Sequence, residues 1–281
     1  MSGQALALPR VERAALFGAL ASECLHLEID TYPKPGLVSL VDNGSHRDMD
    51  AALLQGSADL LEPYFAELAA AGAAGAEMGR LRVIGIEAER AMLAATGGVN
   101  TYRGAIFGLG LLCAAAGFRD ACGSGHSLGR IVANLWGEAI VSGPVPLHSH
   151  GAVAGRRFGA GGARQQAAAG FPLLYRVGLP ALRHGFDLAP GDAEAARVQC
   201  CLALIAELDD TNLLHRGGEA GLAYARAAAA SFIGRGGIAV PGWREEAVAL
   251  HAAFVERNLS PGGAADMLAM TLFLHRLGAS C

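Results

Sequence analysis

Polar side chains crowd into one broken stretch near the N-terminus, EIDTYPKPGLVSLVDNGSHRDMD, which runs from Glu28 to Asp50. Pro33 and Pro35 interrupt regular structure there, because proline fixes its own φ and moves the preceding residue out of the α region. Carboxylates in such a loop can hold a metal ion or move a proton, and cations can bind phosphate groups. We therefore expect this stretch to be a functional loop.

The only lysine of the chain lies between these two prolines, at position 34; the other Lys and Arg residues, which together number 22, are all arginine. An ammonium is a compact point charge, whereas a guanidinium is wide and planar, so the two do not replace each other freely. Chance placement of a single lysine is the plain alternative. We expect Lys34 to bind phosphate and, as a loop residue, to contribute little to stability.

A second polar cluster, ELDDTNLLHRGG, follows an apolar helical pattern at residues 207–218. Asp209 and Asp210 at a helix C-terminus oppose the helix dipole, which predicts a metal ion or an arginine beside them. An equally common alternative is that an aspartate caps the next turn. His215 and Arg216 come just before two glycines and are candidate phosphate ligands.

The segment TGGVNTYRG, residues 96–104, places Asn100 and Arg103 just before a strongly apolar run. Free N–H groups at a helix N-terminus can bind an anion, and the flanking polar residues favour that interpretation. A plain helix–helix turn is about equally compatible with the two glycines.

The last helical pattern begins NLSPGGAAD. Ser260 is expected as its N-cap and Pro261 as its first helical residue. Asp266 lies one turn inside this apolar helix, where a carboxylate is costly unless it is paired or exposed.

A Gly/Pro-rich segment at about 142–172 divides the helical chain in two. Its length favours a functional loop or lid over a domain boundary. Arg156, Arg157 and Arg164 could close over phosphates.

Alanine dominates the remaining segments and strand formers are scarce, which favours helix throughout. The apolar periodicity predicts an all-α fold, with residues 1–281 forming a single multi-helix globular domain whose polar site collects helix ends. The predicted helices cover residues 9–29, 49–71, 81–95, 104–118, 131–140, 173–183, 193–208, 219–231, 243–256 and the segment after 260.

Composition excludes some classes of partner. Of the 281 residues, 17% are charged and the net charge is -4, which argues against nucleic acid, because phosphate-backbone binding needs a basic face. Six cysteines without a C-x-x-C pair are typical of a reduced, cytoplasmic protein. No signal-peptide pattern is present, and the longest uncharged run, 104–118, is too short to span a bilayer. We expect no membrane partner and a possible homodimer.

Several of these motifs together resemble the triphosphoribosyl-dephospho-coenzyme A synthases, over essentially the whole chain: PKPGLV, NGSHRDMD, TGGVNTYRG, DDTNLLHRGG and RNLSPGGAADMLA. The resemblance implies an all-α enzyme that joins ATP to 3′-dephospho-coenzyme A and expels adenine. Its product would be the prosthetic-group precursor of malonate decarboxylase or citrate lyase, passed on to an acyl-carrier subunit by a separate transferase. Tyr102 and Arg103 depart from the family's usual His-Lys pair, and Gln165 and Gln166 from its Gly-Glu pair.

The implied reaction is substitution at C1′ of the ATP ribose by the 2′-hydroxyl of dephospho-coenzyme A, which calls for two carboxyl groups and a held triphosphate. The expected catalytic residues are Glu28, Asp48 and Asp210. The expected phosphate-binding residues are Lys34, His46, Arg47, Asn100, Arg103, His215 and Arg216. The expected ligands of Mg²⁺, the cofactor that accompanies ATP, are Asp48, Asp50, Asp209 and Asp210.

Two other classes stay open at this point. One is an Mg²⁺-dependent hydrolase of N-glycosidic bonds, of the ADP-ribosyl type, which would use water and need no acceptor. The other is a non-enzymatic helical scaffold, against which the clustered charges of an otherwise apolar chain argue. The alanine- and arginine-rich composition favours the malonate pathway over the citrate pathway.

Overall fold

The structure is a computed structural model that describes residues 10–144 and 161–278. Over these residues the regular elements are helical, so the predicted all-α fold class is confirmed. Eleven α-helices are present in this part of the chain. They are α1 (Arg10–Ile29), α2 (Ala51–Ala73), α3 (Met78–Ala95), α4 (Arg103–Cys122), α5 (Leu128–Ser142), α7 (Gly162–Ala168), α8 (Leu179–Leu188), α9 (Ala193–Glu207), α10 (Thr211–Gly234), α11 (Trp243–Glu256) and α12 (Gly262–Arg276).

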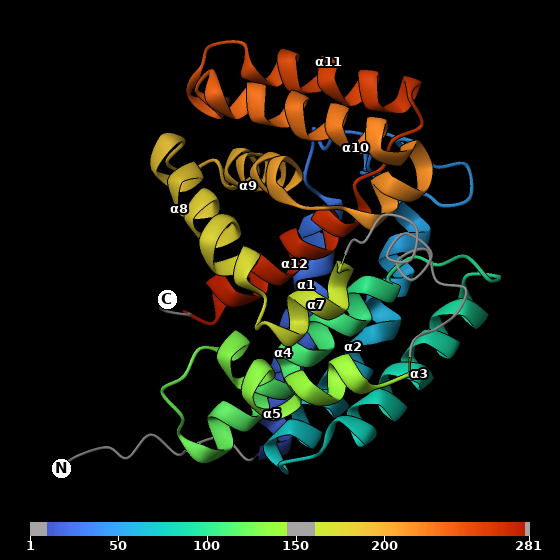
Figure 1. Ribbon diagram of the computed structural model, residues 1–281, viewed down its shortest axis with the longest axis vertical. Coiled ribbons are helices and arrows are strands. Elements are labelled where there is room, and N and C mark those ends of the chain that lie inside the picture. Colours follow the sequence, from blue (N-terminus) through green and yellow to red (C-terminus); the bar gives the residue numbers. More distant parts are fainter. Residues whose placement is uncertain (1–9, 145–160, 279–281) are drawn as a thin grey trace.

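Helix α4 lies in the middle of the molecule and packs against α1, α2, α3, α5 and α12 (Figure 1). Among the described residues it is the one helix long and apolar enough to cross a membrane, and 67% of its most apolar window is buried inside the protein. Its buried residues belong to the hydrophobic core that runs through both halves of the chain. The run predicted as a buried helix over 104–118 is thus a core helix of 20 residues.

The abundance of glycine and alanine in α4 follows from how closely it approaches α2. A Cβ added at Gly72 would lie 1.9 Å from the carbonyl oxygen of Ala114, and one at Gly117 would lie 1.9 Å from that of Ala69. Atoms that close would overlap, so only glycine allows the two backbones to touch at both levels. This contact fixes α4 relative to α2, and therefore fixes the direction of its N-terminal end.

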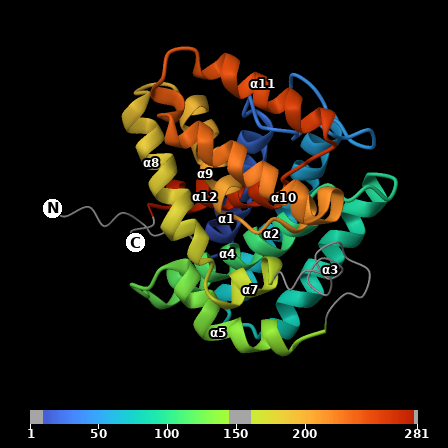
Figure 2. The same ribbon diagram turned by 45° about the horizontal axis from the view of Figure 1, so that its top comes forward.

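The C-terminal half forms a second group of helices, in which α9 packs against α8 and α10. Helices α10 and α11 lie side by side at one end of the molecule, at the opposite end from α5 (Figures 1 and 2). Helix α12 then returns to the centre, where it packs against α1, α4 and α9. It thereby joins the two halves and brings its own N-terminus beside those of α4 and α10.

The segment predicted as one loop over 142–172 contains a helix, α7, in its described part. The guanidinium of Arg164 donates to four carbonyl oxygens at the C-terminal end of α5, among them those of Ile140, Gly143 at 2.9 Å and Pro144 at 2.7 Å. Its charge therefore satisfies carbonyls that the helix leaves unpaired. Arg156 and Arg157 lie outside the described residues.

Helix α10 begins at Thr211, eight residues before the predicted start at 219. Asp210 is its N-cap, and Oδ1 accepts hydrogen bonds from the N–H groups of Asn212 at 2.8 Å and Leu213 at 3.3 Å. The glycines that suggested a break produce a kink at Gly218 (φ 61°, ψ -162°), and the helix continues beyond it.

Two further predicted helix limits were wrong. Ser260 is not the N-cap of α12: the helix starts at Gly262 with Pro261 in the capping position, and no side-chain cap bond is made. The hydroxyl of Ser260 bonds His46 instead, at 2.8 Å. The helix predicted over 173–183 divides into a π-helical turn, Leu174–Gly178, followed by α8.

Candidate active site

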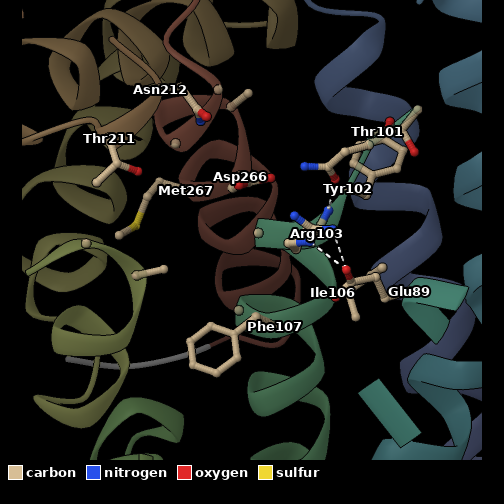
Figure 3. Close-up of a pocket in the computed structure, with 18 of the residues that line it drawn as sticks. Glu89, Thr101, Tyr102, Arg103, Ile106, Phe107, Thr211, Asn212, Asp266 and Met267 are labelled. Atoms are coloured by element: carbon tan, nitrogen blue, oxygen red, sulfur yellow. Dashed lines mark hydrogen bonds and ion pairs between the residues drawn. The ribbon is translucent and has the colours of Figure 1, made fainter. Parts of the chain in front are cut away.

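A cavity of about 1410 Å³ opens where the N-terminal ends of α4, α10 and α12 meet the loop that follows α1. Figure 3 shows Arg103 from the start of α4, Asn212 from the start of α10 and Asp266 from α12 around this space. Single ligands commonly occupy pockets of about 300–1000 Å³. The cavity therefore has room for two nucleotide-sized molecules.

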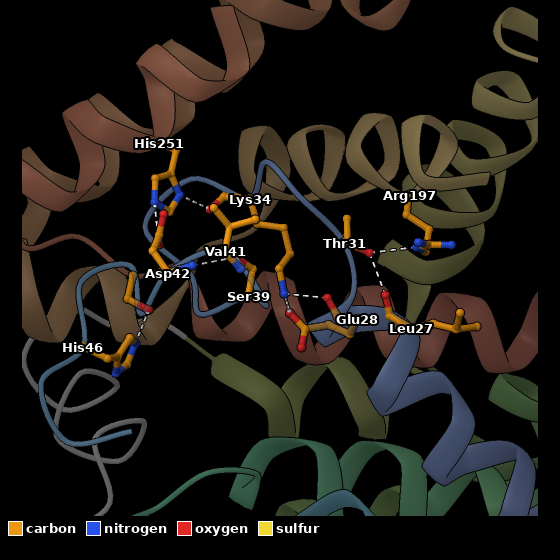
Figure 4. Close-up of polar contacts among 11 residues, drawn as sticks. Leu27, Glu28, Thr31, Lys34, Ser39, Val41, Asp42, His46, Arg197 and His251 are labelled. Carbon is orange, nitrogen blue, oxygen red and sulfur yellow. Dashed lines mark hydrogen bonds and ion pairs between the residues drawn. The ribbon is translucent and has the colours of Figure 1, made fainter. Parts of the chain in front are cut away.

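Glu28, the next-to-last residue of α1, lines the cavity and forms an ion pair with Lys34. The ammonium of Lys34 donates to the Glu28 carboxylate and to the Glu28 carbonyl oxygen, each at 2.5 Å (Figure 4). Lys34 is fully buried behind Glu28 and is not part of the cavity lining. Its ammonium therefore neutralises Glu28, and its burial does not support the predicted contact with a phosphate.

His251 of α11 fixes the loop around Lys34, a role that the sequence analysis did not anticipate. Its buried ring places Nδ1 2.7 Å from the carbonyl oxygen of Lys34 and Nε2 3.0 Å from Oδ1 of Asp42 (Figure 4). The two contacts tie both ends of the turn between Lys34 and Asp42 to one helix. A lone histidine in an amphipathic helix gives no sequence signal for such a role.

His46 and Arg216, both predicted as phosphate ligands, meet at the cavity wall. Nη2 of Arg216 lies 3.2 Å from Nδ1 of His46, and Nη1 donates to the carbonyl oxygen of Ser45 at 2.9 Å. Nε2 of His46 faces the Ser260 hydroxyl. Burial and the neighbouring guanidinium lower the pKa of His46, although Asp48 opposes them. A neutral imidazole at this position offers one donor and one acceptor.

Arg103 and Asn100 also lie where the sequence predicted, at the start of α4. Oδ1 of Asn100 accepts the N–H of Arg103 at 3.0 Å, and the guanidinium pairs with Glu89 of α3 through Nε at 2.7 Å and Nη2 at 2.5 Å (Figure 3). Glu89, which no sequence pattern assigned to the site, thereby holds the arginine at the cavity rim. The side chain of Arg103 stays partly exposed.

Asp210 is buried and joins two helix N-termini. Besides capping α10, its Oδ2 accepts the N–H of Ala264 in α12 at 3.0 Å. Burial raises the pKa of Asp210 to about 6, although backbone N–H groups, including that of Gly263, favour the charged form. Because its oxygens are engaged in this way, Asp210 holds α10 and α12 in register, whereas it was predicted as a base and a metal ligand.

Asp266 is a further carboxylate of the cavity lining. It accepts a backbone hydrogen bond from Ala105, in the first turn of α4. Burial raises its pKa well above the ordinary value, and the charges of Asp210 and Glu28 raise it further. A Cβ at Gly104 would lie 2.0 Å from Oδ2 of Asp266, so only glycine leaves room for the carboxyl group here.

Tyr102 lies beside these carboxyl groups. The ring is buried, and its hydroxyl has no hydrogen-bond partner among the described residues. Burial raises its pKa, with further contributions from Glu28 and Asp266. A buried hydroxyl without a partner is costly, so its place beside these carboxyl groups is a feature of the site.

The four aspartates predicted as metal ligands are not brought together. Asp50 caps α2 by accepting the N–H of Leu53 at 2.8 Å, Asp209 pairs with Arg226 at 2.6 Å, and Asp48 lies 3.4 Å from His46. Over the ranges 10–144 and 161–278, no group of three or more His, Cys, Asp or Glu side chains is arranged to hold a metal ion.

The remaining predicted site residues differ in whether they line the cavity. Asp48, Asp209 and the exposed His215 line the cavity. Arg47 and Asp50 are exposed residues outside that lining.

Residues 14–280 match the sequence profile of a protein family described as ATP:dephospho-CoA triphosphoribosyl transferase. A probable 2-(5''-triphosphoribosyl)-3'-dephosphocoenzyme-A synthase of Azotobacter vinelandii is 40% identical over 282 residues, covering 99% of this chain and 96% of the relative. One of Pseudomonas putida is 40% identical, with 96% and 97% covered. The synthase of Pectobacterium atrosepticum is 41% identical, with 90% and 86% covered. No solved structure matches.

Proposed function

The chain belongs to the ATP:dephospho-CoA triphosphoribosyl transferases, and from that membership we propose that it transfers the triphosphoribosyl group of ATP to the 2′-hydroxyl of 3′-dephospho-CoA and releases adenine. The observation that carries the proposal is the Glu28–Lys34 pair at the wall of a cavity large enough for two nucleotides. A buried carboxylate that is paired with a lysine and lines the cavity is placed to take a proton from an attacking hydroxyl.

The triphosphate has a suitable place at the rim of the same cavity. Arg103 and Arg216 line it, together with Asn100, His46 and His215. Helix N-termini present N–H groups and a favourable dipole to anions, and the ends of α4 and α12 meet here. Guanidinium groups add bidentate hydrogen bonds to phosphate oxygens. These side chains come from segments that are far apart in the sequence.

A magnesium ion that enters with ATP would neutralise part of the triphosphate charge. Mg²⁺ usually keeps several waters and takes only one or two protein carboxylates in addition to phosphates. Asp48 and Asp209 suit that requirement, because both line the cavity with exposed carboxylates. Asp210 does not, since backbone N–H groups occupy its oxygens.

The product would be the prosthetic-group precursor that a separate transferase places on an acyl-carrier subunit. Malonate decarboxylase and citrate lyase are the two enzymes considered as users of such a group. We propose malonate decarboxylase, because the chain is rich in alanine and arginine. The genes beside the coding sequence test this assignment.

The test of the reaction is to incubate the protein with ATP and 3′-dephospho-CoA and to identify the products. Free adenine should appear without pyrophosphate, and the thiol product should gain the mass of ribose and three phosphates. Adenine released at the same rate without an acceptor would instead indicate an N-glycosidic hydrolase. Formation of ADP or pyrophosphate would contradict both functions.

A further inference from the structure

We propose that Asp266 is the general acid of this site, which donates a proton to N3 or N7 of the adenine while Glu28 accepts the proton of the attacking hydroxyl. The inference rests on the proposed function and assigns a role that the resemblance of the sequence motifs leaves open.

Asp266 lies at the junction of two helices. Its carboxyl group accepts the N–H of Ala105 in α4, and its Oδ2 occupies the space that a side chain at position 104 would need. Figure 3 shows Asp266 between the side chains from the start of α10 and those of Tyr102 and Arg103. The carboxyl group is thus held by the backbone of α4 at the wall of the cavity, where a substrate can reach it.

Two carboxyl groups of the site, those of Glu28 and Asp210, act on Asp266, and the three have unequal surroundings. Glu28 has the ammonium of Lys34, and Asp210 has N–H groups from two helices. Asp266 has one backbone N–H bond and feels the charges of the other two. The pKa of Asp266 lies well above its ordinary value, so Asp266 is the carboxyl group that retains a proton, whereas Glu28 is held in an ion pair with Lys34.

This arrangement supplies the two protonation states that the reaction needs. A carboxyl group that retains its proton can serve as the acid while an ion-paired carboxylate serves as the base in the same step. The hydroxyl of Tyr102, which has no partner among the described residues, lies close enough to Glu28 and Asp266 for both to raise its pKa.

In the proposed step, the bond between C1′ and N9 breaks and its electron pair stays with adenine, which takes the proton of Asp266. The 2′-oxygen of dephospho-CoA forms its bond to C1′ and loses its proton to Glu28. The step leaves Asp266 ionised and Glu28 protonated. Transfer of that proton through solvent restores both groups, so that atoms and charges balance over one turnover.

The first test compares Asp266→Asn with wild type, and with Asp120→Asn as a matched control at the distant ion pair with Arg13. Loss of a general acid should lower the kcat of adenine release by about 10²–10⁴-fold, with the Kd of ATP changed no more than about threefold. The kcat of wild type should also fall on the alkaline side, as Asp266 loses its proton, and that limb should be absent from the variant. A variant that keeps a tenth of wild-type turnover, or the same alkaline limb, would overturn the proposal.

A second test uses wild type alone and does not depend on how the variant folds. ATP analogues with 3-deazaadenine or 7-deazaadenine each lack one nitrogen that could accept the proton. One of the two should be turned over at least about a hundredfold more slowly than ATP, whereas turnover of both analogues at the rate of ATP would refute proton donation to the adenine by Asp266. The products made by wild type from ATP test the proposed function separately, because adenine release can be confirmed whichever analogue reacts.

Discussion

Lys34 and Glu28 form an ion pair in the interior of the protein, with Nζ 2.5 Å from Oε1 and neither side chain more than 6% exposed. Only Glu28 belongs to the cavity lining. The lysine therefore pairs with Glu28 from the interior of the protein, whereas Glu28 itself lines the cavity. Removing one member of such a pair leaves the other charge uncompensated, whereas replacing both with apolar residues is often tolerated.

The first prediction follows from this asymmetry. Lys34→Ala should lower the free energy of unfolding by about 3–5 kcal/mol, because the Glu28 carboxylate would stay buried without a partner. This replaces the expectation that a loop lysine contributes little to stability. Activity should be lost as well, and Lys34→Arg should not restore it, since the wider guanidinium has no space in a fully enclosed site.

A double variant separates stability from catalysis. Lys34→Met combined with Glu28→Leu should recover most of the stability, measured by urea denaturation, but none of the adenine release. Wild-type stability and turnover in Lys34→Ala would contradict both the structural and the catalytic importance of the pair.

Helical periodicity predicted much of this fold, and α11 has both of the ends expected from the sequence, Trp243 and Glu256. The burial of Lys34 could not be predicted in the same way. A lysine between two prolines resembles an exposed loop residue, and it is enclosed because His251, 217 positions further along the chain, binds its carbonyl group. Interactions over that sequence separation leave no local pattern.

The candidate site was predictable in outline. The sequence placed Glu28 and Arg103 correctly at helix ends, because polar segments interrupt the apolar runs there. Arg216 was expected just before a helix but lies inside α10, since the glycines that follow it kink the helix and do not end it. It could not divide roles among aspartates. Asp210 accepts N–H groups at the starts of two helices, α10 and α12. Asp266, which was expected only to be costly to bury, is a carboxyl group of the cavity lining.

The second prediction concerns the pH dependence of stability. The pKa of Asp210 rises from an ordinary 3.8 to about 6 on folding, so between these values the folded state binds more protons than the unfolded state. The contribution of Asp210 is then complete below pH 4 and is lost as the pH rises through 6, by an amount on the order of 3 kcal/mol.

The prediction is checked with Asp210→Asn, because other groups titrate in the same range. Burial lowers the pKa of His46, for example, which makes wild type gain stability as the pH rises. The difference in unfolding free energy between the variant and wild type should shift in favour of the variant from pH 4 to pH 7. A difference that stays constant over this interval would show that Asp210 does not titrate as stated.

The third prediction is a requirement for a divalent cation. Chelation should weaken ATP binding more than dephospho-CoA binding, because the ion is expected to sit on the triphosphate. Asp48→Asn or Asp209→Asn should cost about a hundredfold in activity if that residue holds the ion. Asp59→Asn, which removes an exposed ion pair between two residues outside this lining, Asp59 and His26, is the matched control. Full activity with metal-free ATP in the presence of EDTA would exclude the requirement.

The fourth prediction concerns the acceptor. Coenzyme A carries a 3′-phosphate beside the 2′-hydroxyl that is proposed to attack, and the proposed base, Glu28, is a buried carboxylate whose single positive partner, among the described ion pairs, is Lys34. Placing a phosphate dianion next to that carboxylate juxtaposes like charges, which costs several kcal/mol when water is excluded. We therefore expect the kcat/KM for coenzyme A to be at least about a hundredfold below that for dephospho-CoA. The discrimination should persist at high salt, because buried charges are screened much less than exposed ones.

Equilibrium binding to Glu28→Gln distinguishes charge repulsion from steric crowding. Without the carboxylate charge, the Kd of coenzyme A should approach that of dephospho-CoA. If the gap in Kd is the same in the variant as in wild type, the shape of the cavity rather than the charge of Glu28 selects the acceptor.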